Sequence, residues 1–239
     1  MQDLTERQKN ILEIVITEYI NHASPISSKF IENEYDLGVS PATIRAELFA
    51  LIEKGYLYQP HTSSGRVPTD KGYRFLVDSL SEKEVARLEY KMIKEVKKMQ
   101  KEVENKIRFM HEFTRFLAET SSSLTVSYFP REHILLKEGW SKVLQDPEFD
   151  DVDKVHRFTA MVNDFEDNID DIFSDNNDCV RIYIGGETPF SENKDFSIMM
   201  SSYPMKRKKA YFAIMGPKRM AYDKNIQLLE SIIKTLKEK

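Results

Sequence analysis

The chain has 239 residues, a formal net charge of −4 at pH 7 and a hydrophobic fraction of 41%. This length allows two small domains with separate cores, and this composition excludes a wholly disordered chain. The single cysteine, Cys179, and five scattered histidines exclude an internal disulfide and a zinc cluster, and the lack of a leader-like or long apolar segment predicts a soluble, cytoplasmic protein.

The beginning of the chain predicts two helices. Thr5 followed by Gln8 is a capping-box pattern, in which each side chain satisfies a free backbone N–H of the other residue. The helix should end before Pro25, because proline disfavours a helical conformation in the residue before it. A second, shorter helix should begin with Ser27 or Ser28 as its cap. The apolar face of the first helix holds Leu12, Val15, Ile16, Tyr19 and Ile20.

A third helix has the sharpest local signal in the chain. Ser40 is a favoured N-cap, and Pro41 occupies the first helical position, where its missing N–H costs nothing. Gly55 follows the helix at a place that favours a left-handed cap. Residues 36–39 form a short turn with a glycine, of the kind that sets two helices at a steep angle. The apolar face of the third helix holds Ile44, Leu48, Leu51 and Ile52.

Two short strands and a polar loop follow the third helix. Residues 56–59 and 66–68 predict strands, and residues 61–65 predict a loop whose glycine permits a tight turn. The resulting order is helix, helix, turn, helix, strand, loop, strand. This order predicts a winged helix-turn-helix, a domain that binds DNA.

The third helix and the loop supply the predicted DNA contacts. In such a domain this helix enters the major groove, and its N-terminal residues reach base edges. With the apolar face inward, positions 42, 43, 46 and 49 point outward, and Arg45 on the flank is the evident donor to bases or phosphates. Taken alone, the helix is equally typical of an ordinary capped surface helix. The predicted DNA-binding residues are Ser40, Ala42, Thr43, Arg45 and Ala46 in the helix and His61, Thr62, Ser63, Ser64, Gly65 and Arg66 in the loop.

The charge of this domain is unfavourable for binding nucleic acid. Residues 1–78 hold 8 Lys and Arg against 11 Asp and Glu, a net charge of −3, whereas a DNA-binding domain is usually basic. Residues 40–75 hold five basic and three acidic residues, a net charge of +2. Any phosphate-binding surface must therefore come from the local placement of charges.

Residues 82–119 predict one long, charge-rich helix. Its apolar residues repeat with a 3-4-4 spacing, which keeps a narrow stripe along the helix. The stripe is either a dimer seam or a face that packs against the chain's own C-terminal sheet. From Ile107 onward, Phe109, Phe113 and Phe116 widen the face and favour packing on the sheet. The earlier part favours the seam, with the dimerisation residues Val85, Leu88, Met92, Val96, Met99 and Val103.

The remaining residues predict a domain with strands at 124–129, 180–184, 197–200 and 210–215. An acidic amphipathic helical region covers residues 146–178, and a closing helix covers residues 222–236. Acidic residues from Asp164 onward are spaced somewhat like a calcium loop, but Ile169 stands where the sharp turn needs glycine, so no calcium site is predicted. Without a nucleophile elbow, a paired-histidine motif or a marked nucleophile, the chain is not predicted to be an enzyme.

Two segments of the winged domain resemble the HrcA-type heat-inducible repressors of bacteria. They are residues 39–45, VSPATIR, and residues 59–78, QPHTSSGRVPTDKGYRFLVD. Residues 138–140, 147–149, 184–187 and 214–222 resemble pieces of that family's GAF-like effector domain. Between Phe129 and Glu138, where typical members carry further sequence and an inserted dimerisation domain, this chain is short, so it resembles a shortened member. The resemblance departs at Pro41 and Ala46, where the family usually has a second serine and an asparagine, and this leaves the operator bases open.

The elements and the resemblance together imply an α+β architecture in three parts. These are a winged helix-turn-helix at residues 1–79, a long connecting helix at residues 80–120, and a reduced GAF-like domain with a small antiparallel sheet at residues 121–239. The resemblance implies a repressor that binds an inverted-repeat DNA operator upstream of heat-shock chaperone genes as a homodimer and has the GroE chaperonin as a partner. The residues themselves predict no cofactor and no metal. Two alternatives stay open: a winged-helix regulator that senses a small ligand through its C-terminal domain, and an interaction module that has lost DNA binding.

Overall fold

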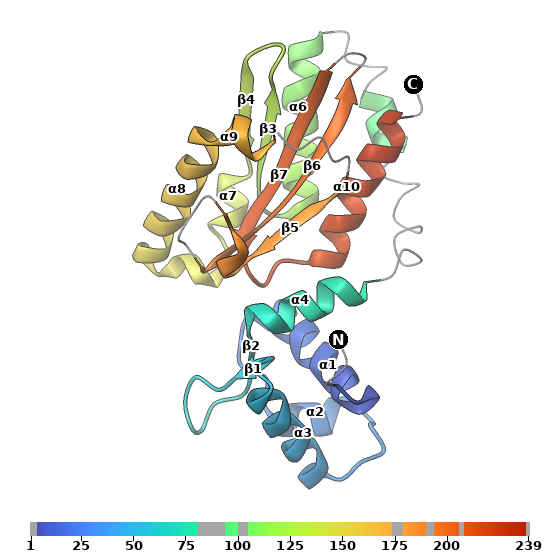
Figure 1. Cartoon of the computed structure of the whole chain (residues 1–239), viewed down its shortest axis with the longest axis vertical. Helices are drawn as coiled ribbons and strands as arrows, with labels where there is room; N and C mark the ends of the chain where they lie inside the picture. Colours follow the sequence, from blue (N-terminus) through green and yellow to red (C-terminus); the bar gives the residue numbers. More distant parts are fainter. Residues whose placement is uncertain are drawn as a thin grey trace. The chain divides into compact units, whose positions relative to one another are not determined.

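The computed structural model describes residues 4–80, 94–99, 105–173, 179–189, 194–205 and 208–237. The chain divides into two compact units, Met1–Leu80 and Ser81–Lys239, and each is described by itself (Figure 1). Within the described ranges, no helix is both long enough and apolar enough to cross a membrane.

The first unit is a winged helix-turn-helix, as the sequence predicted. Strands β1 and β2 are antiparallel, with Leu57 opposite Pro68 and Tyr58 opposite Val67. The loop between these strands is the wing. The elements in chain order are α1 (Glu6–His22), α2 (Ser28–Glu34), α3 (Pro41–Glu53), β1 (Leu57–Tyr58), β2 (Val67–Pro68) and α4 (Asp70–Ser79).

Local capping determines where the first three helices begin. The capping box of Thr5 and Gln8 is present at α1, and the Ser27 side chain accepts a hydrogen bond from the N–H of Phe30 at α2. Ser40 caps α3 in the same way. The predicted starts are therefore confirmed, because each depends on a side chain only three residues away. The core that these helices share includes Ile11, Leu12, Val15, Ile16, Ile31, Ile44, Leu48, Leu51, Leu57 and Tyr73.

The wing is fixed to the body of the first unit at its root. The N–H of Ile26 donates to the carbonyl of Arg66 at 3.0 Å, and the N–H of Arg66 donates back at 2.7 Å. Gly65 lies beside this bridge, and a Cβ atom there would come within 2.5 Å of the backbone of Pro25 and Ile26. Glycine is therefore required at residue 65 by the close approach of another chain segment.

The second unit is built around a five-stranded antiparallel sheet in the order β4-β3-β7-β6-β5. The long central strands pair over ten residues, from Phe196 opposite Pro217 to Met205 opposite Lys208. The elements are α6 (Lys106–Ser121), β3 (Leu124–Phe129), β4 (Ile134–Glu138), α7 (Trp140–Val143), η1 (Pro147–Asp150), α8 (Val152–Asp167), α9 (Ile169–Ile172), β5 (Arg181–Ile184), η2 (Gly185–Glu187), β6 (Phe196–Met205), β7 (Lys208–Pro217) and α10 (Tyr222–Lys237).

Helices cover both faces of this sheet. Phe158 and Phe165 of α8 share one core with Phe196 of β6 and Ala213 of β7. The next residue along β7, Phe212, points to the opposite face and packs against Phe113 of α6, with ring centroids 5.3 Å apart. Helix α10 contacts β6 and α6. The aromatic part of α6 therefore packs against the sheet, as the sequence predicted.

An arginine anchors the connection between β7 and α10. The Nε atom of Arg219 donates to Glu148 at 2.6 Å, and its Nη2 atom donates to Asp146 at 2.7 Å. Desolvation by burial raises the pKa of Asp146, although the neighbouring Arg219 favours the charged carboxylate. These charge-assisted hydrogen bonds hold η1 against the start of α10.

The single long helix predicted over residues 82–119 is wrong as a continuous element. Asn105 has an extended backbone, with ψ at 118°, and its side chain accepts a hydrogen bond from the N–H of Arg108 at 3.1 Å. It is thus the N-cap of a new helix, because its short amide side chain competes with helical hydrogen bonding. Residues 94–99 are helical. Of the predicted stripe, Val85, Leu88, Met92 and Val103 lie outside the described residues.

Candidate nucleic-acid interface

The outward face of α3 is separate from its buried face. Ile44, Leu48 and Leu51 are at most 2% exposed. The exposed residues at positions 42, 45, 46 and 49 follow the i, i+3, i+4, i+7 spacing of a single helix face. At 3.6 residues per turn they share an arc of about 100°. The structure therefore brings part of the predicted recognition surface onto one continuous strip.

The N-terminus of α3 is closed by its own side chains. The Ser40 hydroxyl accepts a hydrogen bond from the N–H of Thr43 at 3.2 Å and lies 2.9 Å from the Thr43 hydroxyl. Ser40 stays exposed, whereas Thr43 is half-buried. These two predicted contact residues are thus first of all a cap, and Arg45 is the cation of this helix end.

The charges beside this face are arranged in favour of an anionic partner. Arg45 is exposed, and within the described ranges no hydrogen bond or ion pair engages its guanidinium. Glu47, only two residues away, is turned into a contact with α1: it accepts from Gln8 at 2.9 Å and lies 3.5 Å from Arg7. The carboxylate nearest to Arg45 along the chain is therefore compensated, and the charge of Arg45 is available to solvent.

The wing is a tight turn held by its own backbone and by Gln59. The N–H of Ser64 donates to the carbonyl of His61 at 2.9 Å, and the Ser64 hydroxyl accepts from the His61 N–H. Gln59 donates to the carbonyls of Thr62 and Ser64, at 2.8 and 2.9 Å. Gln59 was not among the predicted site residues, because its role is to position the turn and needs tertiary information to detect.

The predicted wing residues divide into an exposed tip and a root. His61, Thr62 and Ser63 are exposed, and within the described residues no hydrogen bond engages their side chains. Gly65 is buried, and Arg66 is half-buried with its Nη1 atom donating to the carbonyl of Ser64 at 3.3 Å. The tip can therefore meet phosphates directly, whereas Arg66 braces the turn from inside.

Two exposed aromatic residues near these elements were not in the predicted contact set. Phe49 on α3 is 61% exposed, and Tyr58 on β1 is 47% exposed. The sequence predicted that Phe49 lies on the outward side of the third helix. For Tyr58, the available signal was the alternation along a strand, in which Leu57 points inward and Tyr58 outward. Neither residue carries a charge or an amide, so neither was counted as a donor to DNA.

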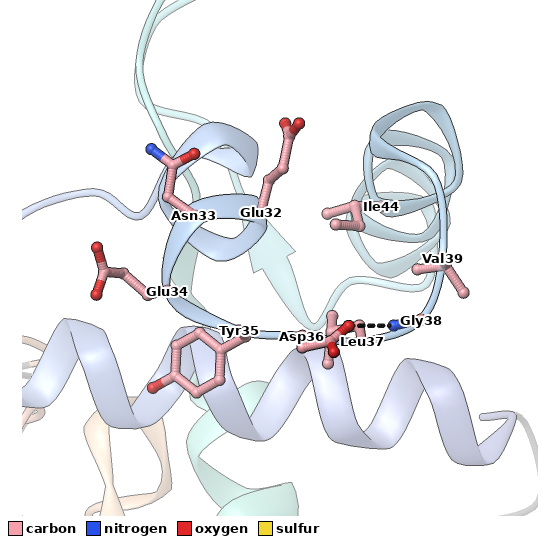
Figure 2. A pocket seen from close by; sticks show the side chains of 9 residues that line it. All are labelled: Glu32, Asn33, Glu34, Tyr35, Asp36, Leu37, Gly38, Val39 and Ile44. Atoms are coloured by element: carbon pink, nitrogen blue, oxygen red, sulfur yellow. Dashed lines mark hydrogen bonds between the residues drawn. The ribbon is translucent and has the colours of Figure 1, made fainter.

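A hollow of about 550 Å³ lies at the turn between α2 and α3. Figure 2 shows its lining residues and the hydrogen bond from the N–H of Gly38 to Asp36, which is 3.2 Å long. Three of the lining side chains are carboxylates, at positions 32, 34 and 36. A wall with this charge repels phosphates, so the hollow does not extend the DNA-facing surface.

The hydroxyl of Tyr35, beside this hollow, donates to Glu18 of α1 at 2.6 Å. That hydrogen bond to a carboxylate raises the pKa of Tyr35 to about 12, because ionised tyrosine would lose the bond and repel Glu18. His22 also lies 3.0 Å from Glu18. The group ties the end of α2 to α1 and so fixes the angle at which the turn enters α3.

Two further features concern metal ions and the proposed dimer stripe. The described residues hold no group of three or more His, Cys, Asp or Glu side chains that could bind a metal ion. Of the proposed dimer stripe, Val96 is 1% exposed and Met99 is partly buried in the single chain. A residue that is already covered by its own chain has little surface left to offer a partner.

Comparisons with known proteins connect both units to one kind of regulator. The model of the HrcA protein C-terminal domain matches residues 69–226, and the model of the LexA DNA-binding domain matches residues 1–65. A heat-inducible transcription repressor HrcA from Desulforudis audaxviator (strain MP104C) is 37% identical over 176 residues, which cover 70% of this chain and 49% of the relative. The chain thus spans about half the length of that relative.

Two further comparisons concern a second relative and the fold. A heat-inducible transcription repressor HrcA from Thermoanaerobacter sp. (strain X514) is 58% identical over 77 residues, covering 32% of this chain and 22% of that protein. A crystal structure described as a hypothetical protein at 2.2 Å resolution superposes with a TM-score of 0.75 and 18% identity, covering 99% of this chain and 98% of that chain. This likeness shows that the two proteins share a fold.

Proposed function

The chain belongs to the HrcA family, and on that premise we propose that it represses transcription by binding double-stranded DNA through α3 and the wing. The relatives are named heat-inducible transcription repressors, and we extend that role to this chain. The proposed activity is binding, not catalysis. We further propose that the bound site is an inverted repeat upstream of chaperone genes, that two copies of the chain bind it together, and that the GroE chaperonin assists the protein.

The observation that carries this proposal is that the Arg45 side chain is exposed and that, within the described residues, no hydrogen bond or ion pair engages it. A guanidinium that no carboxylate of its own chain engages is free to donate two hydrogen bonds to the O6 and N7 atoms of guanine, or to contact a phosphate. Arg45 meets this condition within the described residues, and it stands one turn from the start of α3. In a helix-turn-helix this part of the helix reaches base edges.

The wing adds contacts that do not depend on sequence. The exposed hydroxyls of Thr62 and Ser63 and the ring of His61 suit phosphate oxygens, which accept hydrogen bonds from such groups. Because Arg66 supports the turn through Ser64, we expect it to act on DNA affinity partly by holding this tip in place. Local placement of charge therefore matters more than the acidic total of the unit, since Arg45 is exposed and Glu47, two residues away, is engaged by Gln8 and Arg7.

Binding by the full chain to labelled genomic fragments at low salt tests the proposal. We expect specific shifts, and Arg45→Ala should weaken binding to the best fragment by roughly 1–3 kcal/mol while leaving binding to random DNA nearly unchanged. Arg131→Ala is the matched control, because Arg131 is an exposed cation between β3 and β4 of the second unit. Equal binding by wild type and Arg45→Ala would reject the role of Arg45, and the absence of any shift would reject DNA binding.

A further inference from the structure

The recognition strip of α3 has an apolar half as well as Arg45. Phe49 lies one turn after Arg45 on the same face, and the exposed Ala46 lies within one turn of it. The exposed large apolar side chains of the described residues are Phe49, Tyr58, Ile107, Leu144 and Val152. Of these, only Phe49 stands on the helix proposed to enter the major groove.

Folding of the first unit does not require an aromatic residue at position 49. The opposite face of α3 is filled by Ile44, Leu48 and Leu51, which are at most 2% exposed. Phe49 is 61% exposed and takes no part in that core. Helix propensity also favours other residues, since phenylalanine is a weaker helix former than alanine or lysine. The side chain is therefore free to contact whatever meets this face.

We propose that Phe49, with the methyl group of Ala46 beside it, contacts the 5-methyl group of a thymine in the major groove and so helps to select the operator. This inference rests on the proposed DNA-binding function. The thymine methyl is the apolar group on base edges in that groove, and the other groups are hydrogen-bond donors and acceptors. An apolar side chain against any of those would leave a polar group desolvated and unpaired.

Helix geometry places this thymine relative to the base that Arg45 contacts. Four residues advance about 6 Å along a helix axis, which corresponds to roughly two base-pair steps of DNA. Phe49 follows Arg45 by four residues. The thymine should therefore lie within about two base pairs of the position at which Arg45→Ala relaxes sequence preference.

The experiment uses the full chain and begins with selection of binding sites from a random duplex library. Each thymine of the selected site is then replaced singly by uracil, which removes the 5-methyl group and keeps every hydrogen-bonding atom. At one position in each half-site, the affinity of the wild type should fall roughly fourfold, the effect expected for one buried methyl group. Uracil at thymines in the flanking DNA is the control on the DNA side.

The protein variants assign that methyl contact to a side chain. Phe49→Ala should bind the thymine site more weakly and should bind the thymine and uracil sites equally, whereas Phe49→Leu should keep part of the difference. Val152→Ala is the matched control, because Val152 is an apolar side chain 65% exposed on α8 of the second unit. Circular dichroism should show unchanged folding, since none of these side chains belongs to a core.

The outcomes separate this inference from the function on which it rests. If the wild type selects no DNA sequence, the proposed function fails and the inference fails with it. If the wild type selects a site whose affinity is insensitive to every uracil, DNA binding stands and the thymine contact is rejected. If Phe49→Ala retains the full difference between thymine and uracil, the methyl group is read by another residue and the assignment to Phe49 is overturned.

Discussion

At the scale of single residues, hydrogen bonds to carboxylates fix the geometry of the helix-turn-helix. Glu18 on α1 accepts from Tyr35 at the end of α2, and Glu47 on α3 accepts from Gln8 on α1. Both contacts join residues far apart in the sequence, and both use acidic residues that make the unit's formal charge negative. Some of the acidic residues that make the unit's net charge negative are therefore used in hydrogen bonds within the unit. The net charge alone does not show this.

The Tyr35 hydrogen bond predicts a loss of stability at alkaline pH. The pKa of Tyr35 is about 12 in the fold and about 10 in an unfolded chain. A raised pKa in the folded state means that the contribution is fully present below pH 10 and is lost as the pH rises toward 12. Tyr35→Phe should therefore be less stable than wild type by about 1 kcal/mol below pH 10, and the difference should shrink between pH 10 and 12.

Urea unfolding followed by far-UV circular dichroism at several pH values measures this difference. Fluorescence of Trp140, the only tryptophan of the chain, reports the second unit and serves as the control, because Tyr35 belongs to the first. A stability difference that stayed constant from pH 9 to 12 would show that the hydrogen bond to Glu18 does not raise the pKa of Tyr35.

At the scale of elements, how well the sequence predicts the structure depends on how local the cause is. The start of α3 follows from Ser40 and Pro41, and the pattern of the wing strands follows from alternation, so both could be predicted. Helix α4 was missed although its start is local, since the Thr69 side chain accepts a hydrogen bond from the N–H of Gly72 at 3.2 Å. Strand β4 was missed because its cause is not local: it exists through pairing with β3, where Phe129 lies opposite Ile134.

The predicted site was limited in the same way. Exposed donors such as Arg45 can be recognised from residue type and helical position. Gln59 and Arg66 support the wing through hydrogen bonds to its backbone carbonyls. The positions of those carbonyls cannot be predicted from residue types alone. The break between helices at Asn105 was missed although its cause is local. The apolar spacing continues across Asn105, and a single side chain is enough to form the cap.

The root of the wing predicts that Gly65→Ala disrupts one element selectively. A Cβ atom at residue 65 would come within 2.5 Å of backbone atoms of Pro25 and Ile26, which cannot move as a flexible side chain would. We expect a destabilisation of the first unit by roughly 1–3 kcal/mol, the usual cost of overpacking, and weaker DNA binding. Urea unfolding and fluorescence anisotropy measure the two effects.

Ser63→Ala is the control for stability, because Ser63 is exposed at the tip of the same wing. It should leave the unfolding midpoint unchanged. If Gly65→Ala were as stable as Ser63→Ala, the bridge between Ile26 and Arg66 would be too soft to define the wing.

At the scale of the whole molecule, we propose that the stability of the second unit sets the temperature at which DNA binding is lost. Its buried layer between β6 and α10 contains polar atoms without hydrogen-bond partners in the described residues, including both side-chain polar atoms of Asn225 and the hydroxyl of Ser201. Each such buried group costs about 1–3 kcal/mol. The unit should therefore be less stable than its large apolar core alone would suggest.

Asn225→Leu tests this link between stability and function. It replaces a fully buried amide with a somewhat larger apolar side chain that has the same branching of heavy atoms, so we expect a higher melting temperature of the second unit, read from Trp140 fluorescence. DNA binding, followed by anisotropy during heating, should persist to a correspondingly higher temperature. A raised melting temperature with unchanged loss of DNA binding would show that heat acts elsewhere.

The last prediction at this scale concerns how two copies pair. An inverted repeat presents two equivalent half-sites, and a two-fold symmetric protein can bind both only if its recognition helices are held at a fixed separation. The predicted stripe from Val85 to Val103 is our proposed seam. Val96 is already 1% exposed in the single chain, so a charge there would damage the chain's own packing. Leu88 belongs to the same 3-4-4 spacing and is the better probe.

Leu88→Asp should place a charge in the seam and separate the dimer without unfolding the winged unit. Light scattering should give the mass of one chain, and anisotropy should show equal, weak binding to a full and a half operator, where the wild type prefers the full one. Leu144→Asp is the matched control, since Leu144 is 40% exposed in the second unit outside the stripe. If the Leu88→Asp variant stays dimeric and cooperative, the stripe is not the seam. The pairing surface would then lie in the sheet-containing part of the second unit, within the residues that match the HrcA C-terminal domain.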